Sequence, residues 1–185
     1  ATNPPSLQVI DAVVTSSFFN SVVLSVPLPE APLGIAAHPG GTSVLISYPG
    51  RVAAYNVTSG SSFGVVVRQW SQVGVGFLGD LSVSPDARQA YAAASGGKVA
   101  VLGLAAGEEV VALLAAGTTP HETAGSPLAN AFFSADETGT VSRFAPRGPL
   151  EGSLTEGGSY NGLAVSPDAS FVYALNYTMN RVDVM

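Results

Sequence analysis

The chain has 185 residues, a formal net charge of −6 at pH 7 and only 11% charged residues. Seven scattered basic residues argue against nucleic acid as a partner, and an acidic surface of low charge density gives no attraction to anionic lipid. No cysteine is present, so the sequence excludes a disulfide framework, a thiolate metal site and a cysteine nucleophile.

The N-terminal part of the chain predicts two strands. Residues 7–11 alternate as a strand does, residues 12–20 indicate a loop, and residues 21–26 predict a second, outer strand. Residues 27–32 (PLPEAP) predict a rigid connector, because proline cannot serve in a central strand.

The rest of the chain consists of four copies of one turn-bounded unit of short strands, near residues 32–70, 78–115, 120–155 and 160–185. The turn prolines of successive copies lie 46, 42 and 40 residues apart (85 − 39, 127 − 85 and 167 − 127), at Pro39, Pro85, Pro127 and Pro167. A period of this length with several strands per repeat is typical of β-propeller blades. We therefore expect an all-β protein: a single propeller over residues 1–185, with about four blades of four-stranded antiparallel sheet.

The expected strands follow one another without a helix. In the first three copies they cover 33–37, 43–48, 51–57 and 63–69, then 80–84, 89–94, 98–104 and 108–114, then 121–125, 130–134, 140–145 and 150–154. The fourth copy has only three, over 162–165, 171–175 and 181–185. Residues 104–116 (LAAGEEVVALLAA) have local helical propensity, but the repeat predicts a strand there and we follow the repeat.

The last copy also resembles a known repeat. Tyr173-Ala174-Leu175-Asn176 stands where the tetrapeptide that names the YVTN repeat falls, and Ser84-Pro85-Asp86 and Ser166-Pro167-Asp168 match the turn of that repeat. Residues 6–11 (SLQVID) match its third strand. The chain thus resembles the YVTN-type β-propeller repeat family, which includes lactonase-like and surface-layer-type propellers. The resemblance implies a propeller, usually of about seven blades.

The strand count leaves two architectures open. The fourth copy lacks an outer strand, and a small closed ring would form if the strands within residues 7–26 complete this last blade. The alternative is an arc of a larger propeller, which would need more chain or a partner subunit to cover its open faces.

The tunnel mouth of such a propeller is the expected binding face, because the loops that enter the inner strands gather there. We expect Arg51, His121, Glu122 and Tyr160 to be available for binding at this mouth. Some propellers of the resembled family are lactonases or cyclases, so the resemblance implies a lactonase-like hydrolase as an alternative function. The sequence itself shows no acid–base pair, and we assign no catalytic residue.

The two histidines do not predict a metal centre. His38 and His121 lie 83 positions apart (121 − 38), too few and too scattered for the multi-histidine copper or zinc sites that some propellers carry. His38 replaces the serine of the Ser-Pro-Asp turn, which indicates a role in that turn. We expect no metal and no cofactor.

Two sequons, Asn56-Val57-Thr58 and Asn176-Tyr177-Thr178, are candidate N-glycosylation sites. Asn176 also stands at the repeat's own asparagine, where a turn-stabilising side chain is the other interpretation. The opening ATNPPS has neither a charged signal region nor an initiator methionine, which predicts a processed mature end or an excised piece. No run approaches the roughly 18 apolar residues of a membrane span, so we expect no membrane insertion.

These observations favour a non-enzymatic, extracellular or cell-surface repeat protein, secreted and glycosylated. We expect it to bind a protein partner, or to join a larger assembly, through its loop face or its exposed blade edges. The lactonase-like hydrolase is the alternative.

Overall fold

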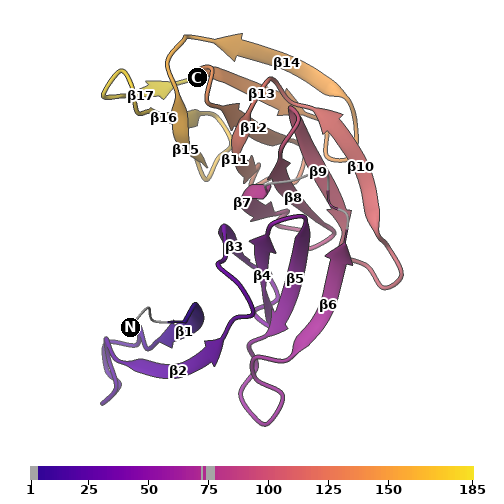
Figure 1. The fold of residues 1–185 in the computed structure, drawn as a ribbon. Coiled ribbons are helices and arrows are strands. Elements are labelled where there is room, and N and C mark those ends of the chain that lie inside the picture. The colour runs from indigo at the N-terminus through magenta and orange to yellow at the C-terminus, as the bar shows by residue number, and fades with distance from the viewer. Residues whose placement is uncertain (1–3, 72, 74–77) are drawn as a thin grey trace. The chain divides into compact units, whose positions relative to one another are not determined.

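The computed structural model describes residues 4–71, 73 and 78–185 (Figure 1). Over these ranges the chain forms seventeen strands and no helix, so the expectation of an all-β protein is confirmed. No segment of this part has the helical length and hydropathy of a membrane span. The chain divides into two compact units, one up to Pro32 and one from Leu33 onward, and each is described by itself.

Unit 1 is a two-stranded antiparallel sheet. β1 (Ser6–Ile10) pairs with β2 (Val22–Pro27), with Leu7 opposite Val26. Both strands lie within one residue of the predicted ranges. That they complete the last sheet of the chain stays a prediction.

Unit 2 contains three four-stranded sheets and one three-stranded sheet, each made of antiparallel strands that are consecutive in the chain. The first sheet comprises β3 (Gly34–Ala37), β4 (Ser43–Tyr48), β5 (Arg51–Asn56) and β6 (Val66–Ser71). The second comprises β7 (Leu78–Val83), β8 (Gln89–Ala94), β9 (Lys98–Gly103) and β10 (Val110–Ala115). The third comprises β11 (Pro120–Gly125), β12 (Phe132–Asp136), β13 (Thr140–Phe144) and β14 (Leu150–Thr155). The last comprises β15 (Tyr160–Val165), β16 (Val172–Asn176) and β17 (Arg181–Val184).

The outer strands β6 and β10 show where local sequence is a weak guide. The segment with helical propensity forms β10, where Leu113 lies opposite Ala100 of β9, because pairing within the sheet overrides local preference. The predicted bounds of β6, residues 63–69, were wrong. The strand begins at residue 66, because the preceding loop turns at Gly60 and Gly64, both with positive φ (123° and 77°).

Serine side chains hold the Ser-Pro-Asp turns. The Ser84 hydroxyl donates to Asp86 Oδ1 (2.7 Å) and accepts the N–H of Gln89 (3.0 Å). The Ser166 hydroxyl donates in the same way to Asp168 (2.6 Å). These hydrogen bonds lower the pKa of both aspartates, so the turns carry ionised carboxylates.

The sheets of unit 2 contact one another through their first strands in chain order: β3 lies beside β7, β7 beside β11, and β11 beside β15. Small hydroxyl side chains connect them. Ser47 donates to the carbonyl of Gly79 (3.0 Å), and Ser82 donates to the Thr123 hydroxyl (3.1 Å). Hydrogen bonds from Ser47 of β4 and Ser82 of β7 therefore join the first three sheets.

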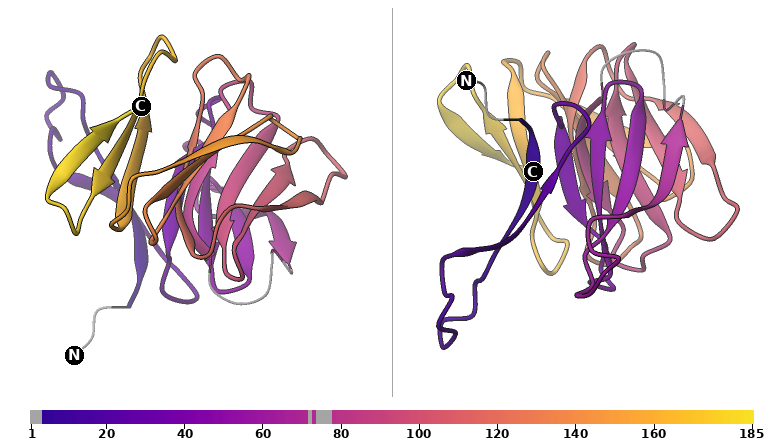
Figure 2. Two further views of the ribbon diagram at one scale, coloured as in Figure 1. Left: turned by 90° about the horizontal axis from the view of Figure 1, so that it is seen from above. Right: turned by 60° about the horizontal axis from the view of Figure 1, so that its bottom comes forward.

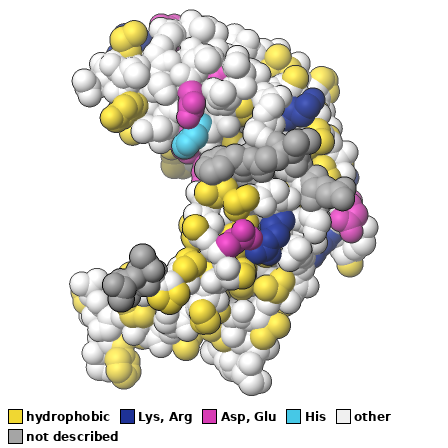
Figure 3. Space-filling view, in the orientation of Figure 1, with side chains coloured by type: hydrophobic (Ala, Val, Ile, Leu, Met, Phe, Trp, Pro, Cys, Tyr) yellow, Lys and Arg dark blue, Asp and Glu magenta, His cyan; other side chains and the backbone are white. Residues whose placement is uncertain are grey.

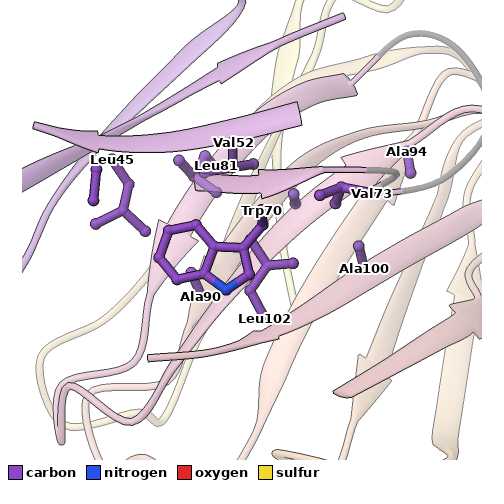
Figure 4. Packing of buried hydrophobic residues seen from close by; sticks show 11 residues of the cluster. Leu45, Val52, Trp70, Val73, Leu81, Ala90, Ala94, Ala100 and Leu102 are labelled. Carbon is purple, nitrogen blue, oxygen red and sulfur yellow. The ribbon is translucent and has the colours of Figure 1, made fainter. Parts of the chain in front are cut away.

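A large core lies between the first and second sheets, around Trp70 of β6 (Figure 4). The indole is 1% exposed, its Nε1 donates to the carbonyl of Gly103 (3.2 Å), and the Arg68 guanidinium lies 4.4 Å from the ring centre. Around it pack Leu45, Val52, Ala54, Val73, Leu81, Ala90, Ala92, Ala94, Ala100 and Leu102.

Between the second and third sheets, three aromatic rings stack. The ring centres of Tyr91 and Phe132 lie 4.0 Å apart, and those of Phe132 and Phe144 lie 4.7 Å apart, with nearly parallel planes. Val99 and Val101 of β9 pack against this stack. The core between the third and last sheets is formed by Ala135, Val141, Tyr160, Val172 and Ala174.

Candidate functional site

An irregularity at the start of β11 brings His121 and Glu122 together. Pro120 lies opposite Asp136 and Glu122 opposite Ala135, so His121 is an extra residue in the ladder, a β-bulge. In a regular strand the two side chains would point to opposite faces. Here His121 Nδ1 lies 2.9 Å from Glu122 Oε1.

Asp80 joins them from the neighbouring strand β7. A similar irregularity lies between Leu78 and Leu81, and the backbone of Gly79 passes so close to β11 that a Cβ there would lie 2.6 Å from the carbonyl oxygen of His121. The Asp80 and Glu122 carboxyl groups hydrogen-bond to each other across this contact. We call Asp80, His121 and Glu122 the carboxyl–histidine cluster.

Burial controls the protonation of the two carboxyl groups of this cluster. Loss of solvent around Asp80 and Glu122 raises the pKa of both carboxyl groups, and the hydrogen bond from His121 lowers that of Glu122 by a smaller amount. Two carboxyl groups in such contact titrate as a pair, and the pair holds a proton to higher pH than an isolated carboxylate would.

A pocket of about 410 Å³ opens beside the cluster. It is lined by Gly79, Ser95, Gly96, Thr119, Pro120, His121 and Glu137. The His121 side chain is 42% exposed whereas that of Glu122 is 15% exposed, so the imidazole faces the pocket and the carboxyl group lies behind it. A histidine held by a carboxyl group and open to a pocket is an arrangement that enzymes use for proton transfer.

Tyr160, which the sequence places in the same binding set, takes part in a different network. It is fully buried, and its hydroxyl donates to Asp183 Oδ2 (2.8 Å). Burial and this carboxylate raise the pKa of Tyr160 to about 12. Asp183 also accepts from Asn176 Nδ2 (3.0 Å) and pairs with Arg181 (2.6 Å). The tyrosine thus supports the last sheet.

Arg51 lies at the start of β5 in the first sheet. Its guanidinium lies 4.4 Å from the ring centre of Tyr48 and donates to Gln69 Oε1 (3.2 Å). The described contacts of Arg51 therefore anchor it to its own sheet. Of the four residues expected at the tunnel mouth, the described contacts join His121 and Glu122 directly.

The two sequon asparagines differ in exposure. Asn56 is partly exposed at the end of β5, where its Oδ1 accepts from Thr58 and its Nδ2 donates to Ser62 (2.9 Å). Asn176 is fully buried, and its Nδ2 donates to Gly157 and Asp183. This geometry favours the turn-stabilising interpretation of Asn176.

Asp80 is the residue of the cluster that sequence reasoning missed. A signal for it exists, because Asp80 and Glu122 both stand five positions before a turn proline (85 − 80 and 127 − 122). Equivalent positions on adjacent first strands meet once the sheets pack. Among the described residues, no group of three or more histidine, cysteine, aspartate or glutamate side chains is arranged to hold a metal ion.

The last sheet has one apolar face that unit 2 does not cover. Val172 and Ala174 of β16 point into the core against the third sheet, so the intervening residues point the other way. Exposed side chains there are Tyr173 (39%), Leu175 (47%), Val182 (55%) and Val184 (58%). We call these four residues the open face. β16 and β17, yellow in Figure 2, end the series of sheets in unit 2.

The second sheet has residues at positions equivalent to the open face, and there they are covered by another sheet. Tyr91 and Tyr173 both stand six positions after a turn proline (91 − 85 and 173 − 167). Val101 lies opposite Tyr91 as Val184 lies opposite Tyr173. The equivalents of the open face in the second sheet are 0–1% exposed, because the third sheet covers them: Tyr91, Ala93, Val99 and Val101.

Charged side chains are sparse on the face of the molecule in Figure 3, as the low charge content predicts.

Comparison of the chain with protein-family models and with curated protein sequences finds no match.

Proposed function

We propose that the chain is a non-enzymatic protein-interaction module of the β-propeller type, and that the open face binds a second copy of the chain. The observation that carries the proposal is that the residues of the open face are exposed, whereas the third sheet covers the equivalent residues of the second sheet. The consecutive four-stranded sheets and the near-regular repeat support the propeller architecture.

A second copy suits this face because the face is apolar and uncharged. Ala164 lies opposite Tyr173 and extends the same surface, and none of these residues bears a charge that a partner would have to neutralise. Exposed contiguous apolar surface of this kind marks protein-binding sites. Two copies related by a two-fold axis would bury the same patch on both sides.

An extracellular or cell-surface location remains part of the proposal, and its sequence argument is the sequon at Asn56.

We expect the chain to self-associate through the open face. Size-exclusion chromatography with light scattering should show a mass that rises from monomer to dimer with concentration. Tyr173→Asp, which places a charge at the centre of the face, should weaken this association at least tenfold, because a carboxylate would lose its solvent there.

Leu128→Asp is the matched control, since Leu128 is 62% exposed in a turn outside the open face. It should associate as the native chain does. A native chain that stays monomeric at every concentration, or a Tyr173→Asp variant that dimerises normally, contradicts the proposal.

A second candidate function, a lactonase-like hydrolase, is favoured by the carboxyl–histidine cluster. The imidazole of His121 faces a pocket and is held by Glu122, so it has the position of a general base that would activate water. In this candidate Glu122 orients the imidazole, which takes the proton of the attacking water, and Asp80 contacts Glu122 from the neighbouring strand.

The hydrolase is tested by screening small lactones and esters. If it is correct, His121→Ala should lower kcat/KM by about 100-fold or more, whereas His38→Ala should leave it unchanged. His38 is the matched control because its Nδ1 accepts the N–H of Gly40 (3.1 Å) within a turn. Equal rates for both variants would remove His121 from the reaction.

A further inference from the structure

A polar pocket of about 400 Å³ lies between the second and third sheets. The second sheet contributes the turn that begins at Ser84 and the start of β8, and the third sheet contributes Pro146 and Arg147 from the turn between β13 and β14. The pocket beside the carboxyl–histidine cluster lies at the other end of β8, next to Ser95 and Gly96. The polar pocket is therefore a separate site.

Polar side chains that are almost completely buried form part of the wall of this pocket. Ser84, Gln89 and Tyr91 are 3%, 4% and 1% exposed, and all three line it. The Gln89 amide and the Tyr91 hydroxyl hydrogen-bond to each other (2.8 Å). Ligand pockets hold a small number of such fixed polar groups, which orient the ligand.

The repeat does not require a glutamine at this place. Gln89 stands four positions after the turn proline of its copy (89 − 85), where the other copies have Ser43, Ala131 and Phe171. Burial of an amide costs free energy unless its groups are hydrogen-bonded, and the other three copies fold without one. A departure from the repeat at a buried position indicates a functional role.

Gln89 positions Arg147. In the orientation that satisfies both ends of the amide, Gln89 Nε2 donates to the Tyr91 hydroxyl (2.8 Å) and to the carbonyl of Pro146 (2.7 Å), and its Oε1 accepts from Arg147 Nε. Glu108 Oε1 accepts from Arg147 Nη2 (3.3 Å). Among the described residues, the contacts of Arg147 thus use Nε and Nη2, and its Nη1 group is left for a ligand.

Asp86 supplies a negative charge to the same pocket. Its Oδ1 accepts from the Ser84 hydroxyl (2.7 Å) and from the N–H of Arg88 (3.1 Å). Its Oδ2 lies 3.8 Å from Nε of Arg88, whose side chain is 79% exposed, and an ion pair of this kind is weak. Burial raises the pKa of the Tyr91 phenol, the charge of Asp86 adds to this effect and that of Arg147 opposes it, so both charges act on one hydroxyl.

The two charges decide the class of ligand. An anion bound to Arg147 would also meet the carboxylate of Asp86, and a cation bound to Asp86 would meet two guanidinium groups, those of Arg88 and Arg147. A molecule with both a carboxylate and an ammonium group satisfies each side, and a guanidinium is the side chain that best matches a carboxylate.

We propose that this pocket binds a small zwitterion of the α-amino-acid type, with its carboxylate on Arg147 and its ammonium group on Asp86. The buried amide of Gln89 is the positioning residue that fixes the guanidinium. This site goes beyond the proposed protein-binding function and does not depend on it.

Isothermal titration calorimetry at pH 7 tests the site, with L-serine and L-glutamine as a small and a larger probe. Both amino acids carry both charges at this pH. At least one of them should bind saturably to the full chain, whereas acetate and ethylamine, which carry one charge each, should bind at least tenfold more weakly. Absence of binding by both amino acids, or acetate or ethylamine binding as tightly as they do, would overturn the proposal.

Two variants each remove one of the charges. Arg147→Gln and Asp86→Asn should both weaken amino-acid binding at least tenfold, and the asparagine keeps the oxygen that accepts from Ser84. The native side chains are 47% and 42% exposed, so both variants should fold, which their melting temperatures would show. Native affinity in either folded variant would contradict the assignment of that charge to the ligand.

Arg143→Gln and Asp168→Asn are the matched controls. Arg143 is 50% exposed and pairs with Glu151 (3.2 Å) as Arg147 pairs with Glu108, and Asp168 is the equivalent of Asp86 in the turn of the last sheet. Neither residue lines the polar pocket. Both variants should bind the amino acid as the native chain does, and an equal loss in the controls would show that the effect is not specific to the pocket and would overturn the site.

Discussion

Phe132→Ala should destabilise the protein by about 3–5 kcal/mol, the usual effect of removing a buried phenyl ring. Phe132 is fully buried at the centre of the stack that joins the second and third sheets, with Tyr91 on one face and Phe144 on the other. Its removal leaves a cavity and ends both ring contacts at once. For a chain of this size the melting temperature should fall by about 10 °C, as measured by circular dichroism or calorimetry.

Phe171→Ala is the matched control for this prediction. It removes the same side chain from a position that is 48% exposed, where the ring makes only a tilted contact with Tyr173 at 6.5 Å. Its melting temperature should stay within about 2 °C of the native value. A similar loss for both variants would show that the stack does not hold the two sheets together.

Gly79→Ala should destabilise the protein by about 3 kcal/mol, at the upper end of the usual cost of overpacking. The new methyl group would lie 2.6 Å from the carbonyl oxygen of His121 and 3.3 Å from the Cβ of Ala93. The nearer atom belongs to backbone, so β7 and β11 must move apart. The same movement would admit solvent to Asp80 and Glu122, and this loss of burial should lower the raised pKa of both carboxyl groups, which NMR titration of the carboxyl groups would detect.

Gly152→Ala is the control that tests whether the close approach of β7 and β11 causes the predicted loss of stability in Gly79→Ala. Gly152 lies in β14, no atom lies within 4 Å of a Cβ built there, and its φ is outside the left-handed region. The substitution should leave stability unchanged or raise it by about 0.5 kcal/mol, because alanine loses less entropy on folding. An equally harmless Gly79→Ala would contradict the close packing of β7 on β11.

The strands were predictable because two signals agreed along the chain. β-Branched and aromatic residues alternate within each unit, and the turn residues recur with the repeat, so even the helix-forming sequence around β10 was assigned correctly. The start of β6 was not predictable, because residues 57–65 contain two glycines, Gly60 and Gly64, and either of them suits the turn.

The candidate site was less predictable, because it depends on register and on contacts between sheets. The sequence identified His121 and Glu122, but regular alternation would have separated them, and the bulge at His121 brings them together. Identifying Asp80 as a member of the cluster required the knowledge that β7 and β11 are neighbours. The open face could not be assigned from composition, because Tyr173 has the same sequence context as the buried Tyr91.

Every strand pair in unit 2 joins consecutive strands, and this has a consequence for synthesis on the ribosome. Each sheet can complete its ladder as soon as its own segment of about 40 residues has emerged, without waiting for distant parts of the chain. At roughly 5–20 residues per second, the next sheet follows a few seconds later, and during that interval the newest sheet has one apolar side in water. The last sheet is in the same condition, with Tyr173 and its neighbours exposed as Tyr91 would be before the third sheet is made.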